Sequence, residues 1–115
     1  MRRWNFKGPL KYRNTPTVVD GFRFDSKAEA KRYQELSLLE SCGEIMHIDI
    51  HPVFRLAPEI RYEADFTVYY KDGRIEVEDV KGFCTKEYLL KEKLFNSSHP
   101  LAPIRRIHGN KKVKM

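Results

Sequence analysis

The alternation of apolar and polar residues predicts most of the secondary structure of this chain. Two segments show helical spacing of apolar residues, and four show the two-residue period of strands. The predicted helices are 25–43 and 85–97, and the predicted strands are 44–57, 61–70, 74–82 and 104–109. A small hairpin is expected at 17–24, around Asp20-Gly21. The main order of helix, three strands, helix and strand predicts an α/β fold, with a mixed sheet flanked by helices.

Breaks in these patterns mark the expected ends of the elements. Ser26 and Glu29 have the spacing of a capping box at the start of the first helix. Thr85 is expected to cap the second helix, whose Leu90 is assigned to the core. Pro52 is expected to interrupt the strand at 44–57.

The alternation also fails at the end of the strand at 74–82. Ile75-Glu76-Val77-Glu78 alternates as a half-buried strand does, but Asp79 and Lys81 then take the positions of the apolar face. Packing alone does not explain why a buried stripe of apolar residues ends in an acid and a lysine.

Asp65 lies on the neighbouring predicted strand, and the turn between the strands decides what it faces. A two-residue turn at 72–73 places Asp65 opposite Val80, pointing away from Asp79. A three-residue loop at 71–73, or a bulge, places it opposite Asp79 on the same face. Pairing of apolar residues slightly favours the first register. We adopt the second because two carboxylates and a lysine then converge.

Convergence gives these residues a chemical role. Two carboxylates that face each other repel, and a divalent cation between them removes the repulsion. Oxygen ligands suit Mg²⁺, with Mn²⁺ as a substitute. Lys81 beside such an ion can orient or deprotonate a water, or stabilise charge that develops on a phosphate.

An Asp on one strand followed by Asp-x-Lys on the next resembles the PD-(D/E)xK nuclease superfamily. The segments FDSKAEAKRY, YEADF and VEDVKGF, followed by the helix with LLKEKLF, are similar to small phage-type nucleases of the Holliday-junction-resolvase-like group. The resemblance covers residues 11–108. It implies a restriction-endonuclease-like core and Mg²⁺-dependent hydrolysis of DNA, with 5′-phosphate and 3′-hydroxyl products.

The resemblance also implies roles for single residues. Asp65 and Asp79 would bind the metal, Glu29 would complete the site, and the Val80 carbonyl would add a ligand, while Lys81 would be the catalytic lysine. Ala64 stands where the family name has proline, and in a bulged strand Glu78 could replace Asp79.

Four cations are candidates for contacts with DNA phosphates: Lys91, Lys93, Lys27 and Arg13. Lys91 and Lys93 are also explained by a solvated helix face, and Arg13 by an arm folded onto the domain or onto a partner subunit.

Several of these residues also have simpler explanations. The capping box alone accounts for Glu29. Asp79 and Lys81 could form an ion pair at the end of a strand. His47-x-Asp49-x-His51 places three possible ligands on one face, but we favour a surface or substrate-groove role for them.

The composition and charge of the chain indicate its domain organisation and the kind of partner it suits. The chain has 115 residues, 41% of them hydrophobic, which suits one domain at 17–109 between a basic arm at 1–16 and a basic tail at 110–115. The net charge is +6, and residues 1–19 and 101–115 contain no acid, which suits nucleic acid. Charged ends that only maintain solubility would look the same.

The remaining composition points to a cytoplasmic protein, in a bacterial host cell if a phage encodes it. No apolar run is long enough for a membrane helix, and the basic N-terminus lacks the apolar segment of a secretion signal. Cys42 and Cys84 form no CxxC pattern and are expected to be free thiols.

The sequence also leads to expectations about the substrate, the oligomeric state and two alternative functions. Branched DNA is the substrate that the resemblance implies, and a homodimer follows because a symmetric junction needs two cuts. A nicking or restriction-like nuclease on linear or single-stranded DNA would use the same residues. A non-catalytic DNA-binding module on the same fold is the second rival.

Overall fold

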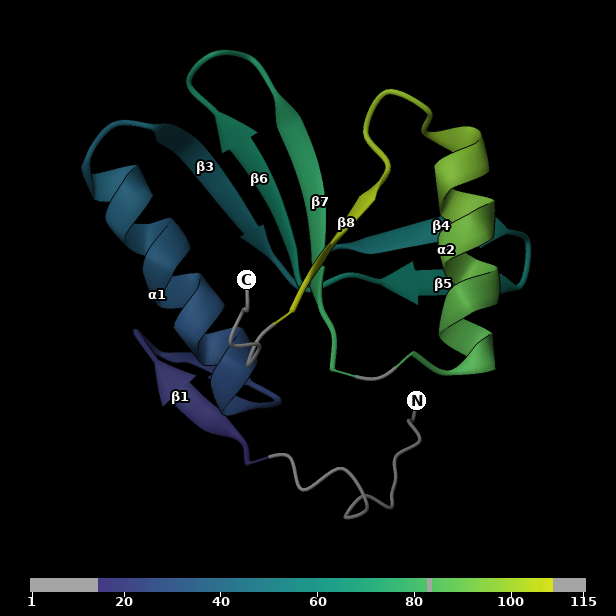
Figure 1. Cartoon of the computed structure of the whole chain (residues 1–115), viewed down its shortest axis with the longest axis horizontal. Helices are drawn as coiled ribbons and strands as arrows, with labels where there is room; N and C mark the ends of the chain where they lie inside the picture. Colours follow the sequence, from purple (N-terminus) through teal and green to yellow (C-terminus); the bar gives the residue numbers. More distant parts are fainter. Residues whose placement is uncertain (1–14, 83, 109–115) are drawn as a thin grey trace.

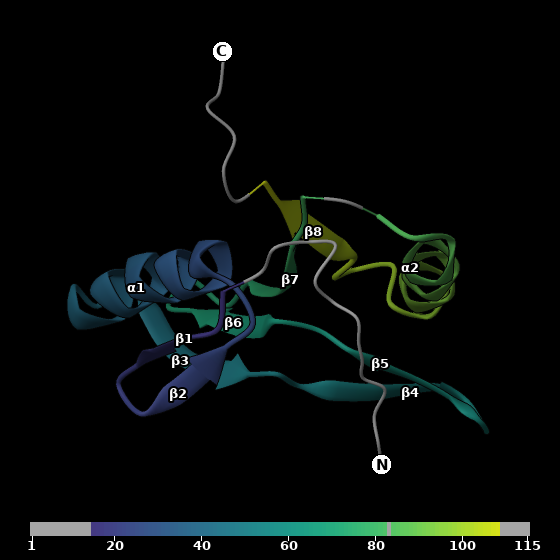
Figure 2. The same ribbon diagram turned by 90° about the horizontal axis from the view of Figure 1, so that it is seen from below.

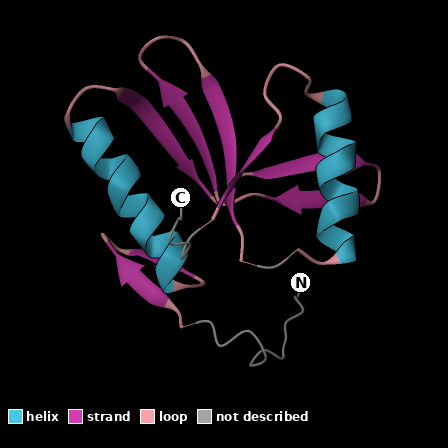
Figure 3. Cartoon of the chain, viewed as in Figure 1, coloured by secondary structure: helices cyan, strands magenta, loops and turns pink. Residues whose placement is uncertain are grey.

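The computed structural model describes residues 15–82 and 84–108 and contains a mixed sheet with two helices (Figures 1 and 3). The arm at 1–14, with Arg13, and the end at 109–115 lie outside the described residues. The elements are β1 (Thr17–Val19), β2 (Phe22–Phe24), α1 (Lys27–Ser41), β3 (Ile45–Ile50), β4 (Val53–Ala57), β5 (Ile60–Glu63), β6 (Phe66–Tyr70), β7 (Ile75–Val80), α2 (Lys86–Ser98) and β8 (Ile104–Ile107).

The central sheet has the strand order β3-β6-β7-β8, and its last pair is parallel while the others are antiparallel. Two hairpins, β1–β2 and β4–β5, stand outside this sheet. The helices α1 and α2 lie on either side of the sheet in Figure 1. The predicted α/β fold with a mixed sheet flanked by helices is therefore confirmed.

The hairpin between β6 and β7 has the register that we adopted from the sequence. Phe66 pairs with Glu78, and Tyr69 pairs with Ile75, which continues to Asp65 opposite Asp79. The loop has three residues, 71–73, and its Gly73 adopts a φ of +98° that other residues rarely tolerate. The alternative two-residue turn is not formed.

The segment predicted as one strand at 61–70 is two strands, β5 and β6, separated by Ala64 and Asp65. The partner segment breaks at the same level, between β3 and β4, where Pro52 was expected to interrupt it. The register is the same on both sides: Ile50 lies opposite Phe66 and Val53 lies opposite Glu63. These four strands are therefore one long hairpin that bends in the middle, and its outer part extends toward α2 (Figure 2).

Each face of the central sheet carries its own core. The core on the α1 side includes Phe24, Leu36, Phe66 and Val68, and the core on the α2 side includes Tyr62, Ala64, Val77, Tyr88 and Phe95. The expected core residue Leu90 is 55% exposed, so that assignment was wrong. The sequence also assigned Phe95 to the core, and it is buried together with Tyr88, because the helix presents their face to the sheet.

The prediction that β7 is half-buried was also wrong. Because α1 and α2 cover opposite faces, neighbouring residues of this strand are both buried: Val77 is 3% exposed and Glu78 is 0% exposed. Ile75, expected on the buried face, is 48% exposed near the end of the strand.

Local sequence signals explain the ends of the helices. The Ser26 hydroxyl accepts a hydrogen bond from the Glu29 N–H, and the Thr85 hydroxyl accepts one from the Tyr88 N–H, as the caps predicted. Cys42 and Cys84 are free thiols. In the part of the chain that the structure describes, neither helix has the length and apolar character needed to cross a membrane.

Candidate active site

Three side chains from three separate segments meet at the bend of the long hairpin. Glu29 comes from the first turn of α1, His51 from the junction of β3 and β4, and Asp65 from the junction of β5 and β6. One ligand atom of each lies within 4.8 Å of the others. The structure thus joins the predicted Glu29 and Asp65 and adds a histidine.

Glu29 serves the helix and the cluster at once. Its Oε1 accepts a hydrogen bond from the Asp25 N–H at 3.1 Å, which helps to hold the start of α1. Its Oε2 lies 2.7 Å from Nε2 of His51. The side chain is almost fully buried, so the cap and the cluster share one carboxylate and are not alternatives.

His51 is fixed by its backbone as well as by its ring. Its φ of +56° lies in the left-handed region, which residues other than glycine seldom adopt and which is often found at functional sites. Its N–H donates to the Asp65 carbonyl at 2.9 Å. The hydrogen bond with Glu29 raises the pKa of His51.

The sequence contained a signal for His51, the alternating His47-x-Asp49-x-His51, but the three residues do not act together. His47 and Asp49 pair with each other at 2.8 Å, and the Tyr69 hydroxyl donates to Asp49 at 2.8 Å. Both belong to β3, and the bend separates them from His51, which joins Glu29 instead.

Asp65 is a half-buried acid that lies near two other acids, Asp79 and Glu29. Its Oδ2 accepts a hydrogen bond from the Val80 N–H at 2.7 Å, which fixes its orientation. Burial, followed by the negative charges of Asp79 and Glu29, raises the pKa of Asp65 well above its usual range. A cation at this point would remove the electrostatic conflict, so the donor set of two carboxylates and an imidazole fits a divalent metal.

Asp79 is buried opposite Asp65, but its oxygens face other partners. The Tyr62 hydroxyl donates to Oδ2, and Nζ of Lys81 lies 3.4 Å from Oδ1. Asp79 does not belong to the group of ligand atoms within 4.8 Å. Its metal-binding role and that of the Val80 carbonyl stay predictions.

Lys81 occupies the position expected from the Asp-x-Lys motif. Its ammonium group lies 4.1 Å from the centroid of the Tyr88 ring on α2, and its side chain is 24% exposed. A lysine placed between an acid and an aromatic face keeps access to solvent and has few other orientations.

Glu78 belongs to the opposite face of β7. Arg32 on α1 binds both of its oxygens, with Nε 2.8 Å from Oε1 and Nη2 2.7 Å from Oε2. The pairing of β6 with β7 is regular through Glu78. The alternative in which a bulge brings Glu78 to the metal is therefore not realised.

The predicted DNA-contacting lysines Lys27, Lys91 and Lys93 lie on the surface. Lys91 pairs with Glu87 at 3.1 Å, one turn away on α2. Lys93 and Lys27 are exposed. Nothing in these positions tests their contact with DNA.

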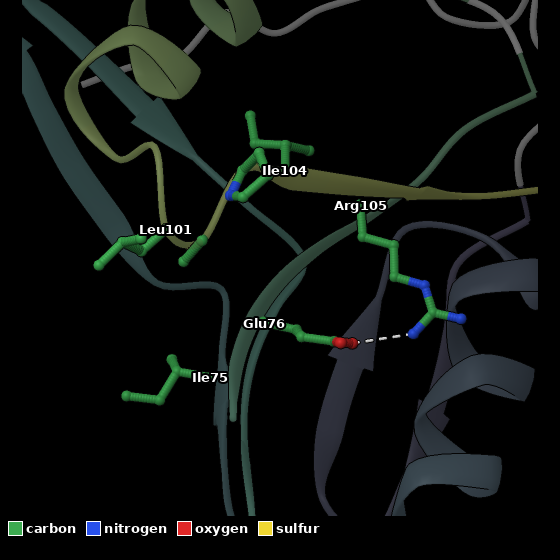
Figure 4. Close-up of a pocket in the computed structure, with 7 residues that line it drawn as sticks. Ile75, Glu76, Leu101, Ile104 and Arg105 are labelled. Atoms are coloured by element: carbon green, nitrogen blue, oxygen red, sulfur yellow. Dashed lines mark hydrogen bonds and ion pairs between the residues drawn. The ribbon is translucent and has the colours of Figure 1, made fainter. Parts of the chain in front are cut away.

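A pocket elsewhere on the molecule has a different character. It lies between the start of β7 and the segment that leads into β8, and an ion pair of 2.8 Å joins Arg105 to Glu76 beside it (Figure 4). Ile75 and Leu101 contribute apolar surface to it. None of its lining residues belongs to the acidic cluster.

Comparison with known proteins gives one match. Residues 10–114 match the family described as "Protein of unknown function (DUF1064)". No curated protein and no solved structure matches the chain.

Proposed function

The chain belongs to this family of unknown function, and we propose from its site that it is a metal-dependent endonuclease that hydrolyses phosphodiester bonds of DNA. The observation that carries the proposal is the register that sets Asp65 opposite Asp79, with Lys81 two residues further along the chain, directly after β7. Ordinary packing does not require a half-buried carboxylate, Asp65, opposite a buried one, Asp79.

The finer fold assignment supports the same conclusion. A helix, α1, precedes a strand meander, and α2 follows and leads to β8, which is parallel to β7. This order resembles the core of restriction-endonuclease-like proteins. We therefore propose that the fold belongs to the PD-(D/E)xK superfamily, with the β1–β2 and β4–β5 hairpins as additions.

Glu29, His51 and Asp65 would hold the cation in this proposal, with Asp79 beside them. The resemblance favours Mg²⁺, whereas the imidazole of His51 suits Mn²⁺ better. A bound divalent cation would supply a Lewis acid and a water of lowered pKa.

The residues of the chain would supply positioning and charge. Lys81 would orient or deprotonate the attacking water, or stabilise the negative charge that develops on the phosphate. Asp79, at 3.4 Å from Lys81, would hold the ammonium group in place.

The substrate is proposed to be branched DNA and the acting unit a homodimer, both by family resemblance. The net charge of +6 supports a polyanionic partner. A nuclease on linear duplex or single strands would use the same residues, so only the choice of substrate separates the two.

A cleavage assay tests the proposal. A four-way junction, a linear duplex and a single strand are each offered with Mg²⁺, with Mn²⁺ and with EDTA. Lys81→Ala is compared with Lys71→Ala, a matched control in the exposed loop between β6 and β7.

Metal-dependent cutting that is lost in Lys81→Ala and kept in Lys71→Ala is the expected result. Tight DNA binding without cutting of any substrate would replace the nuclease with the non-catalytic module. Weak binding that does not respond to salt would exclude DNA as the partner.

A further inference from the structure

Two tyrosines on the α2 side of the sheet contact the Asp79–Lys81 pair, each through a different part of its side chain. The Tyr62 hydroxyl donates a hydrogen bond to Asp79 Oδ2. The Tyr88 ring lies under the Lys81 ammonium group, with Nζ 4.1 Å from its centroid. The sequence motifs did not point to either tyrosine.

The packing around Tyr62 fixes the direction of its hydroxyl. It is 3% exposed, and its ring centroid lies 5.8 Å from that of Phe95 and 6.3 Å from that of Tyr88. It belongs to β5, outside the central sheet, yet its hydroxyl reaches Asp79 on β7. The bend of the long hairpin thus directs a donor to one oxygen of this carboxylate and leaves the other facing Lys81.

Tyr88 is buried and fixed at both ends, and its ring face is the part that Lys81 contacts. Its N–H donates to the Thr85 hydroxyl at 3.0 Å, at the cap of α2. Its own hydroxyl donates to Glu92 Oε2 at 3.2 Å, and Arg106 binds both oxygens of that glutamate at 2.8 and 2.6 Å. The ring therefore attracts the ammonium group from a fixed position.

We propose that Tyr62 and Tyr88 are positioning residues for the Asp79–Lys81 pair, Tyr62 through its hydroxyl and Tyr88 through its aromatic face. This inference rests on the proposed function, because it assigns these contacts to the metal site and the lysine of that function. Residues that orient metal ligands in this way typically change metal affinity or activity by roughly 10- to 100-fold.

The two roles predict opposite responses to the loss of a hydroxyl. Tyr62→Phe removes the part that acts, whereas Tyr88→Phe keeps the ring and loses only the contact with Glu92. Tyr88→Leu removes the ring, and Tyr88→Met does so with a side chain of more flexible shape if the leucine variant does not fold. Tyr69→Phe, which loses a hydrogen bond to Asp49 on the surface, is the control.

The first measurement is Mn²⁺ binding to the DNA-free protein by calorimetry. We expect Tyr62→Phe to weaken binding by about 10- to 100-fold, while Tyr88→Phe and Tyr69→Phe match the wild type. The second is the NMR shift of the Lys81 ε-protons, which the ring current of Tyr88 displaces upfield. Tyr88→Phe should retain this displacement, and Tyr88→Leu or Tyr88→Met should abolish it.

The third measurement is single-turnover cleavage, which should fall in Tyr62→Phe and Tyr88→Leu but not in Tyr88→Phe. Wild-type Mn²⁺ affinity in Tyr62→Phe, or equal cleavage losses in Tyr88→Phe and Tyr88→Leu, would overturn the proposal. A wild-type protein that binds Mn²⁺ but cuts no DNA would refute the nuclease alone, because the binding and NMR results still decide the roles of the tyrosines.

Discussion

His51 lies opposite Asp65 at the bend of the long hairpin, and its N–H donates to the Asp65 carbonyl at 2.9 Å. The same two residues bring their side chains to Glu29. The backbone contact and the ligand cluster therefore depend on one another, and the first prediction concerns the histidine.

Replacing His51 by asparagine should reduce the preference for Mn²⁺ over Mg²⁺. Asparagine tolerates the left-handed backbone at this position and removes the imidazole, which Mn²⁺ accepts more readily than Mg²⁺ does. We expect Mn²⁺ affinity to fall by about tenfold or more, with a smaller change for Mg²⁺. Calorimetry with each metal measures this, and His47→Asn is the control. Equal losses for the two metals would show that the imidazole is not a ligand.

Asp65→Asn should stabilise the metal-free protein at pH 8. Burial and the charges of Asp79 and Glu29 raise the pKa of Asp65, so the folded state binds its proton more tightly than the unfolded state does. The stability linked to this proton is present at low pH and is lost as pH rises through the folded-state pKa. Asparagine removes the charge and can still accept the Val80 N–H hydrogen bond.

Thermal unfolding should then show a gain of about 1 kcal/mol, or roughly 4–8 °C in Tm, that shrinks as pH falls. Asp72→Asn, at an exposed turn, is the control and should give no gain. A destabilised Asp65→Asn protein would contradict the electrostatic conflict that we assign to this cluster.

Divalent metal should raise the Tm, and Asp79→Asn should abolish the rise. A ligand that binds only the folded state adds about 2.7 kcal/mol at 100 times its Kd. Differential scanning fluorimetry with Mg²⁺ and with Mn²⁺ measures the shift. An undiminished shift in Asp79→Asn would place the metal at Glu29, His51 and Asp65 without help from Asp79.

Arg32→Met should be strongly destabilising because it leaves Glu78 buried without a partner. Glu78 is 0% exposed and both of its oxygens bind Arg32. Breaking a buried pair in this way costs about 3–5 kcal/mol. The double variant Arg32→Met, Glu78→Met should recover most of the loss, and urea unfolding of both proteins measures it. A double variant no more stable than the single one would show that packing, not charge, dominates at this position.

The sequence predicted the parts of the fold that local signals control. Gly73 allowed the three-residue loop that places Asp65 opposite Asp79, but local signals also allowed a two-residue turn, and the convergence of two carboxylates and a lysine decided the choice. Ser26 and Thr85 likewise marked the starts of both helices.

What the sequence did not predict depends on contacts between distant segments. The apolar alternation in the sequence of 61–70 shows no break at the bend, although Tyr62 and Ala64 pack on the α2 side and Phe66 and Val68 on the α1 side, so one strand was predicted where two exist. Glu78 was assigned to the solvent side because its partner Arg32 lies 46 positions away in the chain. His51 was passed over for the same reason, since its partner in the cluster is Glu29 on α1.

The register of the long hairpin is unchanged across its bend, and this limits where related chains can differ in length. The tip of the β4–β5 hairpin, at Pro58 and Glu59, lies beyond the last paired residues. Insertion or deletion of residues in pairs at this tip changes the length of the β4–β5 hairpin and leaves the residues at the bend in place. A single residue inserted between Ile50 and Val53 would instead offset His51 from Asp65 and turn the following side chains to the opposite face. Length variation among related chains is therefore expected at the tip of the β4–β5 hairpin and not between Ile50 and Val53.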